Sequence, residues 1–451
     1  MSLSYESRTS LRAAPRNRLP EVEPQRADRE SRPSVATLYR VVWRWHFYAG
    51  LIVAPVLVVM AATGALYIFK DELERVMYAR LMFVTPAESG VSIDAQVATA
   101  QAACPNGFHI DQLEIPADTT RATAVYIHDE AEFRTLFVDP YRGTLLGELG
   151  PGNFFDVVLK IHRTLFVGTL GRIVVELVTC WTIVLLVSGV YLWWPRKGRQ
   201  VWGAWLPRLR RHPYVALRDL HAVCGFYAAL VAIIIAATGL LYTYVWGRGY
   251  AYAAVQSGAY DVFLKPPKSE SPAGAARLPL DQIAAIAGRE LPGCTLGVSI
   301  PHAPDGAFVV FGTSPIGPSS DGVAIIDHAT GKVLAQRDNS EYPLLGWWTS
   351  WNYPLHVGSI LGLVTKVIWL AACIVLMLLP VTGVWMWWQR RPRGKSGFPR
   401  RPVVRVPRAL VVGIIALGAV LPALGLSILA LLLGEGLWSL ARRRRATQAA
   451  S

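Results

Sequence analysis

The sequence is poor in charged residues and in cysteine. Only 17% of its 451 residues are Asp, Glu, Lys or Arg, whereas soluble domains average roughly 25%. Its five cysteines form no C-x-x-C-H segment, which argues against covalently attached haem. It also has no P-loop, no G-x-G-x-x-G pattern and no Ser-His-Asp arrangement. These absences argue against an ordinary soluble enzyme, a nucleotide-dependent enzyme and a serine hydrolase.

Apolar residues, in contrast, make up 53% of the sequence, and they gather in five blocks. Each block exceeds the roughly 20 residues that an α-helix needs to cross a bilayer. The blocks are Val41–Phe69, Ile173–Trp194, Ala222–Trp246, Val364–Trp388 and Ala409–Leu433. We therefore predict a mainly α-helical membrane protein, with four core transmembrane helices and a fifth apolar segment near the C-terminus.

The charges predict how the chain is oriented in the membrane. Residues 195–218 contain seven Lys or Arg and residues 389–408 contain eight, and neither segment contains an acid. The long connections are more acidic: 71–171 has seven basic and 14 acidic residues, and 247–363 has seven and nine. Because cytoplasmic loops are enriched in Lys and Arg, we predict that the short connections are cytoplasmic and the long ones external. The net charge of +14 is then a signal of topology, and no nucleic-acid partner is expected.

Both ends of the chain lie outside this four-helix scheme. Residues 1–38 are rich in Arg, Pro and Ser and contain no apolar stretch, so we expect a disordered cytoplasmic arm and an uncleaved first helix. The fifth block either crosses the membrane once or forms a hairpin broken near Pro422 and Gly425. A single crossing would place the Arg442–Arg445 run outside, against the charge rule, whereas a hairpin would return it to the cytoplasm.

The two halves of the chain repeat each other. His46 and His221 are each followed by a glycine four residues later and by a Thr-Gly pair 17 and 18 residues later. His162 and His356 each lie 27 residues before another glycine, and an aromatic cluster follows that glycine in both halves. Because both halves start on the same side of the membrane, they are parallel repeats related by an axis along the membrane normal.

The long connections repeat as well. Each contains a short amphipathic helix, alternating strand-like segments, and a turn with Asp and Gly four residues apart, at Asp139 and Asp327. Each half is thus predicted to be a helix, a small α+β domain and a second helix. The predicted segments are a disordered arm (1–38), a first transmembrane helix (39–70), a periplasmic domain (71–156), a second helix with its periplasmic approach (157–195), a cytoplasmic loop (196–218), a third helix (219–246), a second periplasmic domain (247–345), a fourth helix with its approach (346–389), a second cytoplasmic loop (390–408), the fifth apolar segment (409–438) and a basic tail (439–451).

The repeat pairs four of the nine histidines. Symmetry places His46 and His221 at one height near the cytoplasmic surface, and His162 and His356 at another near the outer surface. Two imidazoles that face each other across an axis can be the two axial ligands of a haem, so we predict two non-covalent, bis-His haem b groups. Zinc is the competing metal, but no carboxylate or cysteine recurs beside the pairs as a further ligand.

Small and cationic residues near the histidines are further candidates for cofactor binding. The small ones could let a flat macrocycle approach the backbone, although close helix packing also explains them. They are Gly50, Gly225, Thr63, Gly64, Thr238 and Gly239. The cationic ones could hold haem propionates, although anchoring at lipid headgroups also explains them. They are Arg44 and Arg218 on the inside, and Arg163, Arg172 and Lys366 on the outside.

Two features of the spans need a structural explanation. Glu176 and Lys366 are polar residues near the outer ends of apolar spans, a costly place that makes them functional candidates. From His162 to Trp193 a continuous helix would be about 46 Å long, which is more than a bilayer needs. Either this helix bends near Gly168–Gly171 or His162 lies above the hydrocarbon, and the same holds for His356.

Taken together, the motifs of residues 39–392 resemble the PepSY-associated transmembrane family, and most of all its ferric-siderophore reductases and iron-regulated membrane proteins. The resemblance rests on Arg44-Trp-His46, Leu220-His221, Ile161-His162-Arg-Thr-Leu, Leu355-His356, the Thr-Gly pairs, the two G-x-x-x-W-W segments and the two Asp…Gly domains. The long N-terminal arm and the fifth block depart from the compact four-helix pattern of that family.

The resemblance implies a di-haem protein of the bacterial inner membrane, with the four repeated histidines as ligands and an unidentified cytoplasmic or quinol electron donor. Electrons would pass from the inner to the outer haem and reduce Fe(III) bound to a siderophore in the periplasm. Two alternatives stay open. One is a haem-free iron or siderophore permease, or a membrane-anchored interaction protein. The other is a quinol-linked haem relay to another periplasmic acceptor.

Overall fold

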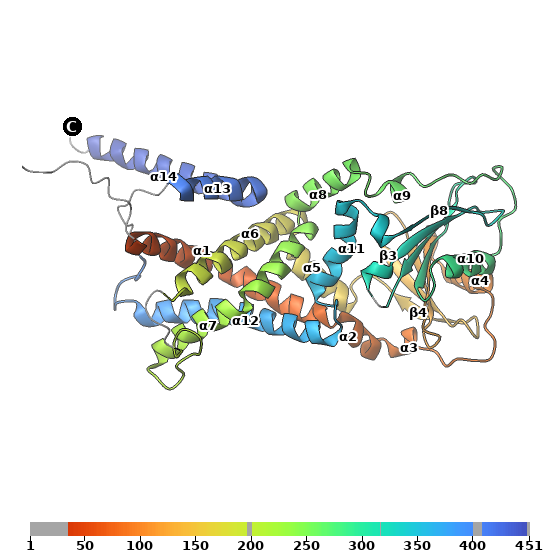
Figure 1. Cartoon of the computed structure of the whole chain (residues 1–451), viewed down its shortest axis with the longest axis horizontal. Helices are drawn as coiled ribbons and strands as arrows, with labels where there is room; N and C mark the ends of the chain where they lie inside the picture. Colours follow the sequence, from red (N-terminus) through yellow and green to blue (C-terminus); the bar gives the residue numbers. More distant parts are fainter. Residues whose placement is uncertain (1–34, 196–200, 316, 400–407, 449–451) are drawn as a thin grey trace, which may run out of the picture.

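Four long helices form a bundle that carries one β-sheet at one end (Figure 1). The computed structural model describes residues 35–195, 201–315, 317–399 and 408–448. The bundle helices are α1 (Val35–Ile68), α6 (Gly168–Trp193), α7 (Pro213–Gly239) and α12 (Leu363–Arg390). These four and the C-terminal helix are long and apolar enough to cross a membrane, so the prediction of a mainly α-helical membrane protein is confirmed.

The bundle is a closed ring in which every helix contacts two neighbours. Helix α1 contacts α6, α6 contacts α7, α7 contacts α12, and α12 contacts α1 again. One buried side chain from each helix meets in a shared apolar cluster: Ala61, Leu186, Ala232 and Leu376. We call the end of the bundle next to the sheet the sheet end, and the opposite end, where residues 201–212 and 391–399 connect the helices, the basic end.

The two histidine-bearing approaches are separate helices. Helix α5 (Phe154–Thr164) is followed by α6 after a turn in which Leu165 and Phe166 have φ of 47° and 60°. Helix α11 (Leu344–Val357) is followed by α12 after a turn bounded by Gly358 and Gly362, with φ of 72° and 58°. The chain therefore bends between each approach and its span, and no single 46 Å helix forms.

The two long connections join in one sheet instead of forming two separate domains. All strand pairs are antiparallel, and the sheet order is β4-β3-β2-β1-β5-β6-β7-β8. Gln112–Ile115 of β1 pairs with Leu296–Ser299 of β5 and so joins the halves. This pairing covers two strand edges that would otherwise expose unpaired backbone groups. The strands are β1 (His109–Ile115), β2 (Thr123–His128), β3 (Phe133–Val138), β4 (Leu145–Leu149), β5 (Thr295–Ser299), β6 (Phe308–Thr313), β7 (Gly322–Ile326) and β8 (Val333–Asp338).

Two equivalent helices, α4 (Ile93–Ala103) and α10 (Leu280–Glu290), cover the face of the sheet that points away from the bundle (Figure 1). Each caps the other. The Asp281 carboxylate accepts from the backbone N–H of Ile93 at 3.1 Å, and the Asp94 carboxylate accepts from that of Leu280 at 2.9 Å. A carboxylate at a helix N-terminus satisfies an unpaired N–H and favours the helix dipole, so the halves also depend on each other here.

Shorter elements complete the connections between the bundle and the sheet. They are α2 (Lys70–Met77), α3 (Ala79–Met82), η1 (Leu240–Tyr242), α8 (Val245–Gln256), α9 (Asp261–Leu264), η2 (Pro318–Ser320) and η3 (Asn339–Glu341).

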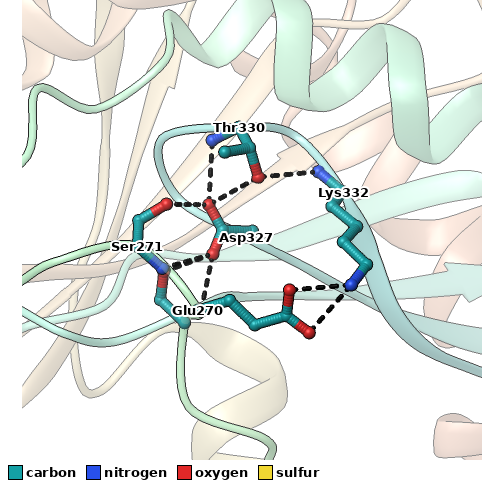
Figure 2. A network of polar contacts seen from close by, with 6 residues as sticks. Glu270, Ser271, Asp327, Thr330 and Lys332 are labelled. Atoms are coloured by element: carbon teal, nitrogen blue, oxygen red, sulfur yellow. Dashed lines mark hydrogen bonds and ion pairs between the residues drawn. The ribbon is translucent and has the colours of Figure 1, made fainter.

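The repeated Asp and Gly form tight turns, and one of them anchors a larger network. Gly143 and Gly331 have φ of 67° and 72°, and their N–H groups donate to the carbonyls of Asp139 and Asp327. The Asp327 carboxylate also accepts bonds from Ser271 and the backbone of Glu270 (Figure 2).

Although burial alone would raise the pKa of Asp327, hydrogen bonds from Ser269, Ser271 and Thr330 outweigh it and hold that pKa well below its usual range. This network ties the chain that follows α9 to the sheet, because Lys332 also pairs with Glu270 at 2.7 Å.

The fifth apolar segment is a helical hairpin. Helix α13 (Arg408–Val420) and helix α14 (Pro422–Gln448) meet at Leu421, and Gly418 and Gly425 bring their backbones into contact. Helix α14 packs on α6 and α8, where the Trp181 indole donates to Ser427 at 3.2 Å. The start of α13 and the end of α14 both lie toward the basic end (Figure 1). Of the two alternatives, this arrangement favours the hairpin, and the side of the membrane on which each end lies stays a prediction.

Several segment boundaries differ from the prediction, and the third helix also ends earlier than expected, at Gly239 instead of 246. Helix α1 begins at Val35, four residues before the expected start, α7 begins at Pro213 instead of 219, and α14 continues through the expected tail to Gln448. The rest of the predicted arm (1–34) and the loop residues 196–200 and 400–407 lie outside the described residues.

Candidate functional site

The four repeated histidines meet in two pairs, one toward each end of the bundle. The ring centroids of His46 (α1) and His221 (α7) are 6.3 Å apart, with an angle of 83° between the rings. Those of His162 (α5) and His356 (α11) are also 6.3 Å apart, at 63°. Each pair takes one histidine from each half of the chain, as symmetry requires.

This spacing fits a metal ion between two opposed imidazoles. An imidazole nitrogen binds a metal at about 2.0 Å and lies about 1 Å from its ring centroid, which places two opposed centroids roughly 6 Å apart. Both pairs have that separation. Among the described residues, no group of three or more His, Cys, Asp or Glu side chains could hold a metal ion. Two axial ligands are what a haem needs, because its macrocycle supplies the other four.

A hydroxyl group holds each of the four imidazoles by its Nδ1 atom. The hydroxyl always comes from the partner helix of the same half, whereas the facing histidine comes from the other half. The Nδ1–Oγ contacts are His46–Ser188 (2.9 Å), His162–Thr63 (2.9 Å), His221–Thr382 (3.0 Å) and His356–Thr238 (3.1 Å).

These contacts favour one position for the proton on each ring. Each hydroxyl donates its single hydrogen to a carbonyl of its own helix, as Thr63 does to Val59 at 2.8 Å and Thr238 does to Ile234 at 2.6 Å. In that arrangement the hydroxyl accepts from the imidazole, which favours the tautomer that is protonated at Nδ1 and keeps the lone pair on Nε2. Metal-bound histidines are usually held in this way through the nitrogen that does not bind the metal. All four Nε2 atoms are thus available as ligands.

A glycine follows each of these hydroxyl residues and makes room for the ring. The position that a Cβ would take at Gly64 is 3.4 Å from Cε1 of His162, and that at Gly239 is 3.0 Å from Cε1 of His356. Gly189 and Gly383 lie against His46 and His221 in the same way, at 3.3 and 3.5 Å. The repeated Thr-Gly pairs therefore contact the histidine rings directly, whereas we predicted that they would contact the macrocycle.

Two of the predicted small residues lie elsewhere. Gly50 faces the side chain of Leu185, at 3.8 Å, and Gly225 faces that of Leu379, at 3.3 Å. These are contacts between neighbouring helices, so close packing explains both glycines. Sequence reasoning missed Ser188 and Thr382 as site residues, although each directly precedes the glycine that marks the repeat.

A large cavity surrounds the pair at the sheet end. It holds about 1260 Å³ of atom-free space, including its open mouth, and both His162 and His356 line it. Its wall is mostly apolar, and the polar exceptions include Tyr67, Tyr242 and Arg163. Apolar cavities with a few convergent polar groups are typical of sites for cofactors.

Arg163 is the predicted cation best placed to face a bound group. Its guanidinium lies 5.7 Å from the ring centroid of Tyr242, and no described carboxylate forms an ion pair with it. Burial and the nearby charge of Arg172 lower the pKa of Arg163. A partly buried cation with no counter-ion is costly, so an anionic group of a ligand in the cavity would stabilise it.

The other predicted cations at the sheet end already have partners in the protein. Arg172 donates to the carbonyls of Tyr242 and Thr243 at 3.3 and 3.2 Å, and Lys366 pairs with Glu72 at 2.8 Å.

At the basic end, Arg218 binds Asp219 at 2.6 Å, together with Arg208. Arg44 lies 5.5 Å from the Tyr48 ring, and its Nε atom is buried without a hydrogen-bond partner among the described residues.

Glu176 has a structural role. Its carboxylate is fully buried and accepts hydrogen bonds from the backbone N–H groups of Val245 and Trp246 at 2.7 and 3.1 Å. It therefore caps the N-terminus of α8, which has no cap of its own from residue Tyr244. The costly position of Glu176 is explained by this cap.

The chain is similar to known proteins over most of its length. Residues 43–390 match the family described as the PepSY-associated TM region. The uncharacterized protein PA4219 of Pseudomonas aeruginosa is 27% identical over 313 residues, which cover 63% of this chain and 75% of that relative. The matched residues contain both histidine pairs and the whole sheet. The chain belongs to the PepSY-associated transmembrane family.

Proposed function

We propose that this protein is a di-haem b reductase of the inner membrane, which carries electrons from the cytoplasmic side to ferric siderophores in the periplasm. The observation that carries the proposal is the pair of facing histidines toward each end of the bundle, each with its Nε2 lone pair free. A bound haem at each pair would supply one-electron transfer.

The two pairs are stacked in the direction that electrons must travel. His46 and Thr63 lie 17 residues apart on α1, which corresponds to roughly 25 Å along a helix. Because Thr63 binds His162, the two proposed haem sites lie one above the other across the bilayer. The charge rule places the basic end in the cytoplasm, so the pair at the sheet end faces the periplasm.

The chemistry at the periplasmic site requires little of the protein. Siderophores hold Fe(III) with hard oxygen donors, and they bind Fe(II) more weakly. In the proposed reaction Fe(III) gains one electron and becomes Fe(II), while a cytoplasmic or quinol donor loses one electron. The chain would hold the cofactor through His162 and His356, orient a propionate with Arg163, and present the open cavity to the chelate.

An absorption spectrum of the purified protein is the first test. We expect a Soret band and about two haems per chain. His46→Ala and His162→Ala should each remove about one haem, whereas His109→Ala, which changes a histidine outside the pairs, should remove none. A wild-type protein without a Soret band would favour the haem-free permease or interaction protein.

Stopped-flow mixing of the reduced protein with ferric siderophores tests the substrate. Reoxidation that saturates with the concentration of the chelate and is lost in His162→Ala is expected. Reoxidation by quinone alone would overturn the assignment of a siderophore substrate and favour the quinol-linked relay.

A further inference from the structure

A second cavity lies in the external part of the first half, away from both histidine pairs. It holds about 530 Å³ of atom-free space, including its opening. Its wall comes from α4, the start of β2 and the turn after β3, and includes Gln96, Thr123, Pro140 and Tyr141. Arg121 and Asp118 lie at the same cavity. None of the repeated histidines or predicted cofactor-binding residues lines it.

The internal repeat shows which residues occupy the corresponding positions of the second half. Asp94 and Asp281 are equivalent caps, so Gln96 corresponds to Ile283. Thr123 pairs with Val138 just before Asp139, and Phe308 pairs with Ile326 just before Asp327, so Thr123 corresponds to Phe308.

By the same alignment, Pro140 of the first half corresponds to His328 of the second. The three residues of the second half are at most 2% exposed: Ile283, Phe308 and His328. The two halves share one fold, but apolar Ile283 and Phe308 stand in the second half where the first has polar Gln96 and Thr123. His328 stands where the first half has Pro140, and neither of its ring nitrogens has a partner among the described residues. An unfilled core cavity destabilises a protein, whereas a polar one can bind water or a ligand.

The polar groups inside the cavity have unused hydrogen-bonding capacity. Gln96 is only 4% exposed; its Nε2 donates to the carbonyl of Val91 at 3.1 Å, but its Oε1 has no partner among the residues that the structure describes. Thr123, which is 2% exposed, lines the same wall. A buried amide oxygen without a partner is costly, so a donor group in the cavity would stabilise the fold.

Two residues of opposite charge, Asp118 and Arg121, line this cavity. The guanidinium of Arg121 lies over the ring of Phe83, 5.6 Å from its centroid. Asp118 accepts hydrogen bonds from the hydroxyl and the N–H of Thr120, and these bonds hold the pKa of Asp118 below its usual range. No ion pair joins Asp118 and Arg121 within the described ranges.

We infer that this cavity binds a small zwitterion of amino-acid size. Arg121 would bind its carboxylate, Asp118 would bind its ammonium group, and Gln96 and Thr123 would accommodate a polar side chain. A cation and an anion at fixed positions recognise a zwitterion better than a ligand of one sign, because an ion of one sign is repelled by one of the two. The inference does not depend on haem binding.

Isothermal titration calorimetry of the purified full-length protein tests it, with L-serine, L-glutamine, L-lysine and L-glutamate as probes. Saturable binding of a neutral zwitterion, serine or glutamine, is expected. Arg121→Gln and Asp118→Asn should each weaken it at least 10-fold. Arg134→Gln, which changes an arginine paired with Glu132 and Glu148 in the same sheet, should leave it unchanged.

Filling the cavity with residues of the second half gives the sharper test. Gln96→Ile and Thr123→Phe should each abolish binding. Circular dichroism melting identifies any variant that does not fold. If one of the two filling variants does not fold, binding to the other variant tests the inference. The inference is overturned if no probe binds, which would leave water as the only occupant, or if binding survives in a folded filling variant.

Discussion

Replacing Ser188 with alanine should weaken haem binding at the basic end more than an equivalent change weakens it at the sheet end. The Ser188 hydroxyl, 2.9 Å from Nδ1 of His46, is the one acceptor that the described residues offer this N–H group. Nδ1 of His356, in contrast, lies near both Thr238 Oγ1 at 3.1 Å and the carbonyl of Ile235 at 3.0 Å. Thr238→Val is therefore the matched variant.

The expected magnitude follows from this difference. A buried N–H group without an acceptor costs about 1–3 kcal/mol, and the loss of such an outer-shell partner weakens metal binding roughly 10- to 100-fold. Ser188→Ala should fall in that range. Thr238→Val leaves the Ile235 carbonyl in place, so its effect should stay below about 5-fold, or about 1 kcal/mol.

The assay should isolate one pair at a time. Ser188→Ala is measured in a protein that also lacks His162 and His356, and Thr238→Val in one that lacks His46 and His221. Haemin titration followed at the Soret band gives the dissociation constant of each. An unchanged dissociation constant in Ser188→Ala would refute the view that these hydroxyls orient the histidines, and equal losses in both variants would refute the view that the Ile235 carbonyl replaces the Thr238 hydroxyl.

Three further predictions concern the scaffold. Glu176→Ala should lower the unfolding free energy by about 2–4 kcal/mol, because it leaves two buried N–H groups of α8 unpaired. Glu176→Gln keeps one acceptor and should lower it by about half as much. Thermal unfolding in detergent measures both variants, and equal stability of all three proteins would contradict the capping role of Glu176. Asp327→Asn should destabilise the sheet by roughly 2 kcal/mol at pH 7. Because folding lowers the pKa of Asp327, the stability that its carboxylate contributes is complete above about pH 4 and is lost as the pH falls through the lower folded value. The difference in melting temperature between the wild-type protein and Asp327→Asn should therefore be constant from pH 5 to 8 and shrink below pH 4. The hairpin predicts that a reporter fused after residue 451 and one inserted between 400 and 407 lie on the same side of the membrane; opposite sides would mean that the fifth segment crosses once.

Much of the architecture was predictable because membrane spans appear in a sequence as long apolar blocks and a duplication appears as recurring residue spacings. Apolar blocks longer than a bilayer is thick are rare in soluble chains, and recurring spacings select His46, His162, His221 and His356 from nine histidines. The spacing also paired them correctly, since a symmetry axis places equivalent residues opposite each other.

Contacts between segments far apart in the sequence were less predictable. The hydroxyls of Ser188 and Thr382 have no pattern of their own, and their role depends on how α6 and α12 are rotated. The joined sheet is another case, because any exposed strand edge can pair with another and the sequence does not mark the partner. Glu176 looked functional because the N–H groups that it caps lie 69 and 70 residues away.

The sequence alone therefore determined which segments cross the membrane, that they form two halves, and which histidines are equivalent. Hydropathy and periodicity depend on local composition, so they can be read without a fold. The tertiary structure decided how the histidines are held, which cations face the cavity at the sheet end, and that the fifth segment is a hairpin. It also decided that a cavity lies beside Gln96 and Thr123 in the first half of the sheet. These properties depend on helix rotation, on side-chain volume and on the distance between groups, and only packing sets those quantities.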